Sequence, residues 1–105
     1  MQGYQLTFFT QQDRRHGGLA VGEWLLQEAR RLGARGATLF NASEGFGRDG
    51  KRHSAHFFEL ADQPVEVVMA LSEADADRLF ARLREEQLDI FYVKTRIEFG
   101  MTGES

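Results

Sequence analysis

The loop over residues 44–53 holds the side chains and glycines best suited to chemistry in this chain. It reads Glu-Gly-Phe-Gly-Arg-Asp-Gly-Lys-Arg-His, so three glycines and three Lys or Arg residues stand between two apolar, strand-like segments. Glycine lets backbone N–H groups approach a ligand closely, and successive amides beside cations can form an anion-binding concavity. The loop is therefore a candidate anion site, with a solvated hairpin tip as the alternative.

A second group of basic side chains, Arg14, Arg15 and His16, follows the first apolar segment. These residues precede a predicted helix, whose N-terminal amides attract phosphate, and guanidinium groups bind phosphate through charge-assisted hydrogen bonds. All three are therefore candidate phosphate contacts. A solvated turn is the alternative interpretation.

Metal ligation is a weaker hypothesis and rests on His53 and His56. On a strand, a spacing of three directs the two side chains to opposite faces, so Zn²⁺ or Cu²⁺ ligation requires a turn or a neighbouring subunit. Structural or solvated histidines are the favoured explanation. The chain has no cysteine, which excludes disulfides, thiolate metal sites and cysteine nucleophiles.

Two acid/base pairs can be drawn between near neighbours in the sequence, Ser43 with Glu44 and His16 with Asp13. No Ser/His/Asp set with a nucleophile elbow accompanies them, and catalytic groups must converge in space to act. The sequence therefore favours a binding protein over an enzyme, with no required cofactor.

Composition predicts one compact domain spanning residues 1–105. The chain has 42% hydrophobic residues, 28% charged residues and a single proline, which is typical of a globular domain. Its net charge of −3 argues against a general nucleic-acid partner, because a phosphate backbone rewards an excess of Lys and Arg. No apolar run reaches membrane-spanning length and the N-terminus lacks a signal-peptide pattern, so we expect a cytoplasmic protein without direct membrane insertion.

Hydrophobic periodicity predicts the helices and strands that position these residues. Alternation over residues 4–10 predicts a strand, and apolar residues at helical spacing over 21–32 predict a helix that ends before Gly33. A second strand begins at Ala37 and runs toward the glycine loop. Residues 55–60 are strand-like on the far side of the loop, which suggests a long hairpin.

The second half of the chain repeats this pattern. Residues 65–71 form a dense apolar run typical of an interior strand, and Ser72 with Asp75 resembles a capping box that starts a helix near Glu73. Residues 88–99 alternate as a final strand. The order β-α-β-β-α-β predicts an α+β, ferredoxin-like sandwich with two helices on one face of an antiparallel sheet.

The uncovered face of such a sheet needs a partner if it is apolar. Phe8 with Phe9, and Phe57 with Phe58, indicate that both faces of their strands carry apolar side chains. Another copy of the chain is the simplest cover. A closed ring of identical subunits would leave clefts between neighbours, where ligand pockets commonly form.

Several segments together resemble the uncharacterised PII-like protein family, relatives of the nitrogen-regulatory PII signalling proteins. The most specific feature is Gly36-Ala37-Thr38 followed by Gly45-Phe46-Gly47-Arg48, which is similar to the strand and turn at the base of the PII T-loop. The full set of matching segments is Tyr4-Gln5-Leu6-Thr7-Phe8-Phe9, Trp24-Leu25-Leu26, Gly36-Ala37-Thr38-Leu39-Phe40 and Glu44-Gly45-Phe46-Gly47.

The resemblance implies a homotrimer that binds an adenine nucleotide in clefts between its subunits. A T-loop-like segment, about residues 46–62, would engage a target protein such as a membrane transporter or channel. Thr38 would lie near the adenine. Gly45, Phe46, Gly47 and Arg48 would form the loop base that meets phosphate, and the tail over residues 100–105 would close over the nucleotide through Gly100, Thr102 and Gly103.

Two departures from the PII pattern bear on the ligand. Residues 85–89 offer neither glycine nor cation where PII proteins have a phosphate-binding B-loop, and Met101 stands where PII proteins have an arginine. AMP, ADP or cyclic AMP is therefore expected in preference to ATP. Residues 48–62 contain no tyrosine, so uridylylation is not predicted.

Two other functions remain open at this stage. One is a metal-binding trimer that uses His53 and His56, with a fold-level analogy to CutA-type proteins that no matching residues support. The other is a purely structural trimer.

Overall fold

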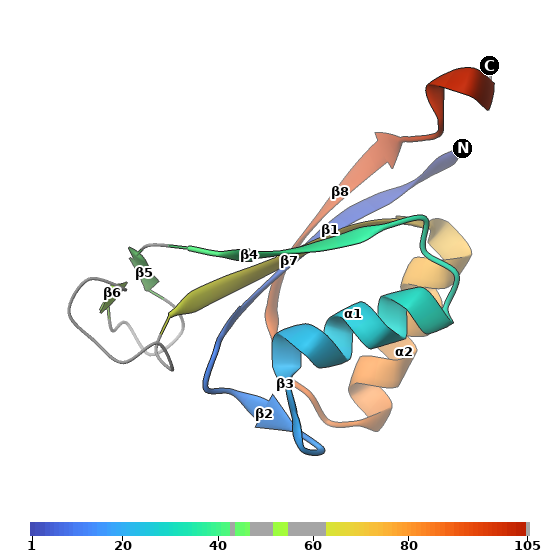
Figure 1. The fold of residues 1–105 in the computed structure, drawn as a ribbon. Coiled ribbons are helices and arrows are strands. Elements are labelled where there is room, and N and C mark those ends of the chain that lie inside the picture. Colours follow the sequence, from blue (N-terminus) through green and yellow to red (C-terminus); the bar gives the residue numbers. More distant parts are fainter. Residues whose placement is uncertain (43, 47–51, 55–62, 105) are drawn as a thin grey trace.

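A four-stranded antiparallel sheet covered on one face by two helices forms the body of the protein (Figure 1). The computed structural model describes residues 1–42, 44–46, 52–54 and 63–104. The sheet has the order β4-β7-β1-β8, and its strands are β1 (Gln2–Gln11), β4 (Ala37–Asn41), β7 (Pro64–Ser72) and β8 (Phe91–Glu98). The helices are α1 (Val21–Arg31) and α2 (Glu73–Glu85). This arrangement confirms the predicted α+β, ferredoxin-like fold.

The core lies between the sheet and the helices. Alternate residues of β1 and β7 face the helices, whereas the residues between them face the other way. On the helix side Leu6 and Phe8 of β1 are buried, as are the four alternate residues Val65, Val67, Met69 and Leu71 of β7. The largest fully buried side chains are Phe8, Leu6, Leu25, Met69, Leu71, Leu79, Val21 and Val67.

The helix ends agree with the sequence signals. The Ser72 hydroxyl oxygen accepts a hydrogen bond of 3.1 Å from the Asp75 amide, so the predicted N-cap of α2 is confirmed. Gly33 follows the last turn of α1 with φ of 87°, a conformation that side-chain-bearing residues rarely adopt. Neither helix, within the part of the chain described, is long and apolar enough to cross a membrane.

Two short two-stranded hairpins accompany the main elements, one before α1 and one after β4. The predicted turn after β1 contains a hairpin of β2 (Arg15–His16) and β3 (Leu19–Ala20), joined by two glycines at positive φ, Gly17 and Gly18. β5 (Glu44–Phe46) pairs with β6 (Arg52–Ser54) in a ladder of its own. A 3-10 helix (Thr102–Glu104) ends the described chain.

Within the described residues β4 pairs with β7, and the segment 55–60 of the predicted hairpin lies outside them. One boundary differs from the sequence prediction. The last strand begins at Phe91 instead of residue 88, because Gln87 adopts φ of 53° and the Leu88 amide bonds back to the Leu83 carbonyl. Leu88 and Ile90 therefore pack toward α2 before the strand starts.

Candidate functional site

The sheet face opposite the helices carries a band of apolar side chains. Strand pairing places Phe40, Glu66, Phe9 and Phe91 in one row across it. The rings of Phe9 and Phe91 lie 5.5 Å apart between centroids. Phe91 is 59% exposed and Phe40 is 49% exposed. Figure 1 shows both helices on the other side of the sheet, so nothing in the described chain covers this band. We call it the open face.

The next row of the open face contains Thr38, Val68, Thr7 and Val93. Val93 is 46% exposed. Among the strand residues that the register places on this face, Glu66 is the single one with a charged side chain. An exposed, nearly uncharged apolar face is typical of a protein interface. The prediction that both faces of the first strand carry apolar side chains is confirmed, since Phe8 is fully buried under the helices and Phe9 lies on the open face. Phe57 and Phe58 lie outside the described residues.

The residues assigned to the nucleotide lie at two distant places in one subunit. Thr38 is exposed on β4, and β5, which contains Gly45 and Phe46, lies beyond the far end of that strand (Figure 1). Gly47 and Arg48 lie outside the described residues.

The tail follows β8 at the opposite end of the sheet, where the two termini lie close together (Figure 1). The Met1 amino group donates a hydrogen bond of 2.9 Å to the Phe99 carbonyl, and the Phe99 amide donates one of 2.9 Å to the Met1 carbonyl. Gly100, Thr102 and Gly103 are exposed there. One subunit therefore does not bring the tail together with β5.

The candidate phosphate contacts Arg14, Arg15 and His16 lie in and before the β2–β3 hairpin. Each already faces an acceptor within the chain. Arg14 Nη2 donates to the Asp89 carbonyl at 2.5 Å, Arg15 Nη2 donates to the Gly18 carbonyl at 2.8 Å, and His16 Nε2 lies 2.8 Å from Glu86 Oε1. A phosphate at this position would compete with these contacts, so the assignment stays a prediction.

A network of charged side chains joins this hairpin to both helices. Glu28 on α1 is only 8% exposed and accepts hydrogen bonds from Arg31 at 2.6 and 3.0 Å and from Arg82 of α2 at 3.3 Å. Burial acts to raise the pKa of Glu28, but the hydrogen bonds and positive charge of Arg31 and Arg82 outweigh it and lower that pKa.

Glu86 links this network to the hairpin. The hydrogen bond with His16 is the main cause of its lowered pKa, and Arg82 contributes further. The Glu28 and Glu85 carboxylates in turn raise the pKa of Arg82, which keeps that guanidinium charged.

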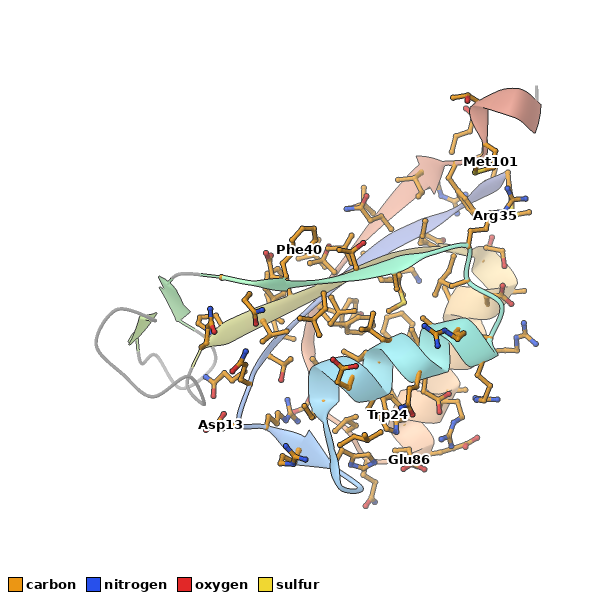
Figure 2. The ribbon with its side chains drawn as sticks, viewed as in Figure 1. Asp13, Trp24, Arg35, Phe40, Glu86 and Met101 are labelled. Atoms are coloured by element: carbon orange, nitrogen blue, oxygen red, sulfur yellow. The ribbon has the colours of Figure 1, made fainter. Side chains whose placement is uncertain are left out.

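Trp24 lies at the centre of this junction (Figure 2). The His16 and Trp24 rings are nearly perpendicular, with centroids 5.6 Å apart, and the Arg82 guanidinium carbon lies 5.9 Å from the Trp24 ring centroid. Sequence reasoning missed the roles of Glu28 and Arg82. The available signal was their helical spacing from Arg31 and Glu86, because residues three or four apart face each other on a helix.

The structure gives no support to a metal site in the part of the chain it describes. No group of three or more His, Cys, Asp or Glu side chains there is arranged to hold a metal ion. His53 belongs to β6, where only the backbone is described, and His56 lies outside the described residues. The metal hypothesis is therefore not tested by this geometry.

Comparison with known proteins gives a family match over most of the chain. The model of the family DUF190, described as Uncharacterized ACR, COG1993, matches residues 3–98. None of the curated proteins matches the sequence.

Solved structures with the same fold include PII-like proteins. TTHA0516 from Thermus thermophilus, provisionally described as a PII-like signaling protein, has a TM-score of 0.67 and 21% identity over 91% of this chain and 87% of that chain. CPII from Thiomonas intermedia, a nitrogen regulatory PII-like protein bound to ADP, AMP and bicarbonate, has a TM-score of 0.65 and 17% identity over 92% and 89%. The apo form of CPII has a TM-score of 0.56 and 15% identity over 92% of both chains.

Proposed function

This chain belongs to the DUF190 family and has the fold of PII-like proteins, and from that premise we propose that it is a cytoplasmic regulator that binds an adenine nucleotide between the subunits of a homotrimer. The observation that carries the proposal is the open face, because an exposed apolar sheet of this kind is stabilised by association with further copies. The structure of CPII with bound ADP and AMP supports an adenine nucleotide as the ligand.

The separation of the assigned residues within one subunit favours a site between subunits. β5 and the tail lie at opposite ends of the sheet, so both can meet one nucleotide only if neighbouring subunits supply them. Thr38 would contact the adenine. Gly45, Phe46, Gly47 and Arg48 would contact phosphate, and Gly100, Thr102 and Gly103 of the neighbour would close the cleft.

The surroundings of the α2–β8 connection favour a ligand with few phosphates. Glu85 and Glu86 place two carboxylates at the end of α2, and the carbonyl of Asp89 is already bonded to Arg14. A third phosphate near these groups would meet negative charge without a backbone glycine turn to bind it. AMP, ADP or cyclic AMP is therefore preferred to ATP.

Regulation would proceed through binding linkage instead of catalysis. A nucleotide shifts a protein between two states only if it binds them with different affinities. In this mechanism the T-loop-like segment, about residues 46–62, makes contacts to the nucleotide in one state, and that state has a different affinity for a target protein such as a membrane transporter or channel. By reciprocity, the target would change nucleotide affinity by the same factor.

Arg48→Ala tests the phosphate role directly. We expect it to weaken binding of AMP and ADP about tenfold or more, because a charge-assisted hydrogen bond is lost, and to leave the affinity for adenosine nearly unchanged. Calorimetric titration of the purified protein with AMP, cyclic AMP, ADP, ATP and adenosine measures both effects.

The matched control is Arg30→Ala, which removes an exposed arginine from the last turn of α1. It should change neither affinity. An equal loss for adenosine and for AMP in Arg48→Ala would remove the phosphate assignment, and a wild-type protein that binds none of the five compounds would refute nucleotide binding.

A further inference from the structure

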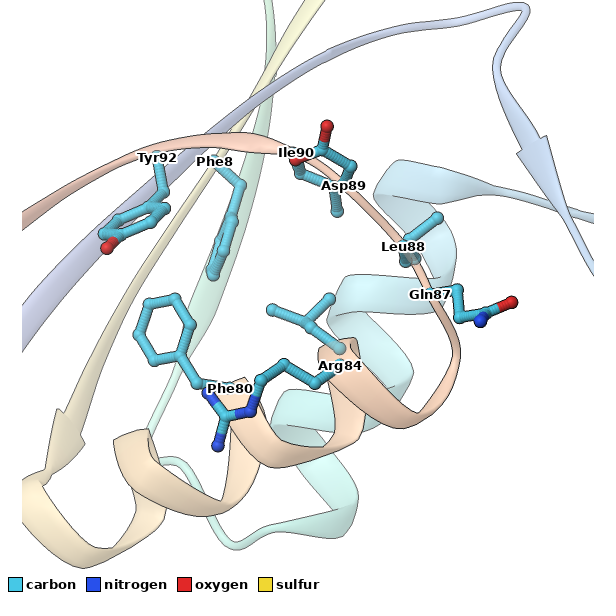
Figure 3. A pocket seen from close by; sticks show the side chains of 9 residues that line it. Phe8, Phe80, Arg84, Gln87, Leu88, Asp89, Ile90 and Tyr92 are labelled. Atoms are coloured by element: carbon cyan, nitrogen blue, oxygen red, sulfur yellow. The ribbon is translucent and has the colours of Figure 1, made fainter.

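A shallow pocket of about 330 Å³ lies between α2 and the start of β8, on the helix-bearing side of the sheet (Figure 3). Sequence reasoning did not detect it, because its walls come from three separate elements. Its lining residues are Phe8, Phe80, Leu83, Arg84, Gln87, Leu88, Asp89, Ile90 and Tyr92.

Three aromatic rings form one wall of the pocket. Phe80 and Tyr92 meet edge to face with centroids 4.8 Å apart, and Phe8 lies 6.2 Å from Phe80 and 6.4 Å from Tyr92. Tyr92 is 46% exposed, so this wall is accessible from solvent. A flat apolar group can therefore stack or pack edge-on here and lose water-exposed area.

Two cations, Arg84 and Lys94, border this wall, and Arg96 lies beyond them on Tyr4. Arg84 lines the pocket. Lys94 Nζ lies 4.2 Å from the ring centroid of Tyr4 and 5.5 Å from that of Phe80. The Arg96 guanidinium carbon lies 5.2 Å from the Tyr4 centroid, and Arg96 Nη2 donates to the Tyr4 hydroxyl at 3.0 Å.

The partners of these three cations differ from those of other arginines on α1 and α2. Arg31, Arg78 and Arg82 each pair with a carboxylate. Within the described chain, no carboxylate forms an ion pair with Arg84, Lys94 or Arg96, and two of these cations rest on aromatic rings instead. Asp89 also lines the pocket, but Figure 3 shows it on the far side from the guanidinium group of Arg84. The mouth of the pocket near Phe80 is therefore positively charged.

We propose that this pocket binds a small anion with a flat apolar body, of the class of aromatic carboxylates. The ring packs against Phe80 and Tyr92, and the carboxylate accepts charge-assisted hydrogen bonds from Arg84 and Lys94. The pocket is separate from the adenine contact proposed for the same subunit, because Thr38 lies on the other face of the sheet and on the strand at its opposite edge. Its lining residues Gln87, Leu88 and Asp89 belong to the α2–β8 connection, which the proposed function places near the phosphates.

Phenylacetate and its neutral analogue phenylacetamide test the proposal by amide NMR titration of the full chain. Phenylacetate should shift the signals of Leu83, Ile90 and Tyr92 with saturation near about 1 mM, an affinity typical of a small ligand in a shallow site. Phenylacetamide should bind about tenfold more weakly, because it lacks the charge that Arg84 and Lys94 recognise.

Substitutions of the two proposed cationic contacts measure how much each contributes to ligand binding. Arg84→Gln and Lys94→Gln should each weaken phenylacetate binding about tenfold while leaving phenylacetamide binding unchanged. Arg78→Gln is the matched control, since it removes an arginine of the same helix that pairs with Asp75 away from the pocket. It should leave both affinities unchanged.

Four results would overturn the proposal. Equal affinity for the acid and the amide would refute recognition of an anion. Shifts confined to the open face would refute the location, and the absence of saturable shifts would refute the site. Displacement of phenylacetate by AMP would show that the two sites are one.

Discussion

Glu28 stabilises the contact between the two helices through its charge. Its carboxylate is nearly buried and bonded to Arg31 and Arg82. Glu28→Gln should lower the free energy of unfolding by about 2 kcal/mol, because hydrogen bonds between charged groups are replaced by weaker ones while both arginines remain. Urea unfolding measures the change. Glu23→Gln, at an exposed position in the first turn of α1, is the control and should cost about 0.5 kcal/mol.

The lowered pKa of Glu28 also sets a pH dependence. Its folded-state pKa lies below the ordinary value of 4.5, so the unfolded chain takes up this proton at a higher pH than the folded protein does. The stabilisation is therefore complete above about pH 4.5 and is lost as pH falls through the folded-state pKa. Below pH 4.5 the unfolding free energy of the wild type should fall more steeply than that of Glu28→Gln. If the unfolding free energies of the wild type and Glu28→Gln fell equally steeply with pH, the lowered pKa of Glu28 would not be the cause.

Sequence reasoning at the residue scale succeeded where the interaction is local. The Ser72 cap lies three residues from its donor, so its geometry follows from the start of one helix. Glu28 and Arg82 are 54 residues apart. Their contact depends on how α1 and α2 pack on the sheet, which no local pattern encodes.

Close packing of the central strand β1 depends on Gly3. A Cβ at this position would lie 2.1 Å from the Leu71 carbonyl oxygen and 2.8 Å from the Phe99 ring. Gly3→Ala should therefore lower the free energy of unfolding by about 3 kcal/mol, because the backbone of β7 must shift. Thermal or urea unfolding checks this.

Gly36→Ala provides the comparison for Gly3→Ala. A Cβ at Gly36 would have no atom within 4 Å, so the unfolding free energy should change by less than about 0.5 kcal/mol. Similar losses in both variants would show that backbone conformation, and not the contact with Leu71, is the cause.

The elements themselves were largely predictable from their periods. β1, β7, α1 and α2 have clear alternation or helical spacing, and the structure places them within a few residues of the predicted ranges. Strand pairing was less accessible, because the apolar pattern of β4 does not specify which neighbour it joins. Leu88 resembled a strand residue, but the conformation of Gln87 delays β8 to Phe91.

The open face is the proposed interface between the subunits of the trimer. Phe91→Ser should convert the proposed trimer to monomers, because it removes the most exposed aromatic side chain of that face. Tyr92→Ser is the matched control, since it removes the next aromatic residue of the same strand from the other face. Light scattering after size-exclusion chromatography gives both masses. Equal masses for the two variants would show that the open face is not the interface.

The fold class and the need to cover one sheet face both followed from the sequence, since the order of elements and the apolar pair Phe8 and Phe9 indicate them directly. The nucleotide site did not, because a single chain separates the residues assigned to it. Those assignments came from resemblance, and Gly47 and Arg48 lie outside the described residues.

Titration of AMP into the wild type and into Phe91→Ser tests the central claim, a nucleotide site shared between subunits, most directly. The account predicts a wild-type trimer that binds one AMP per subunit, and a folded Phe91→Ser monomer, verified by circular dichroism, that binds none. A monomer that binds AMP with the affinity of the wild type would contradict it, because the site would then lie within one subunit.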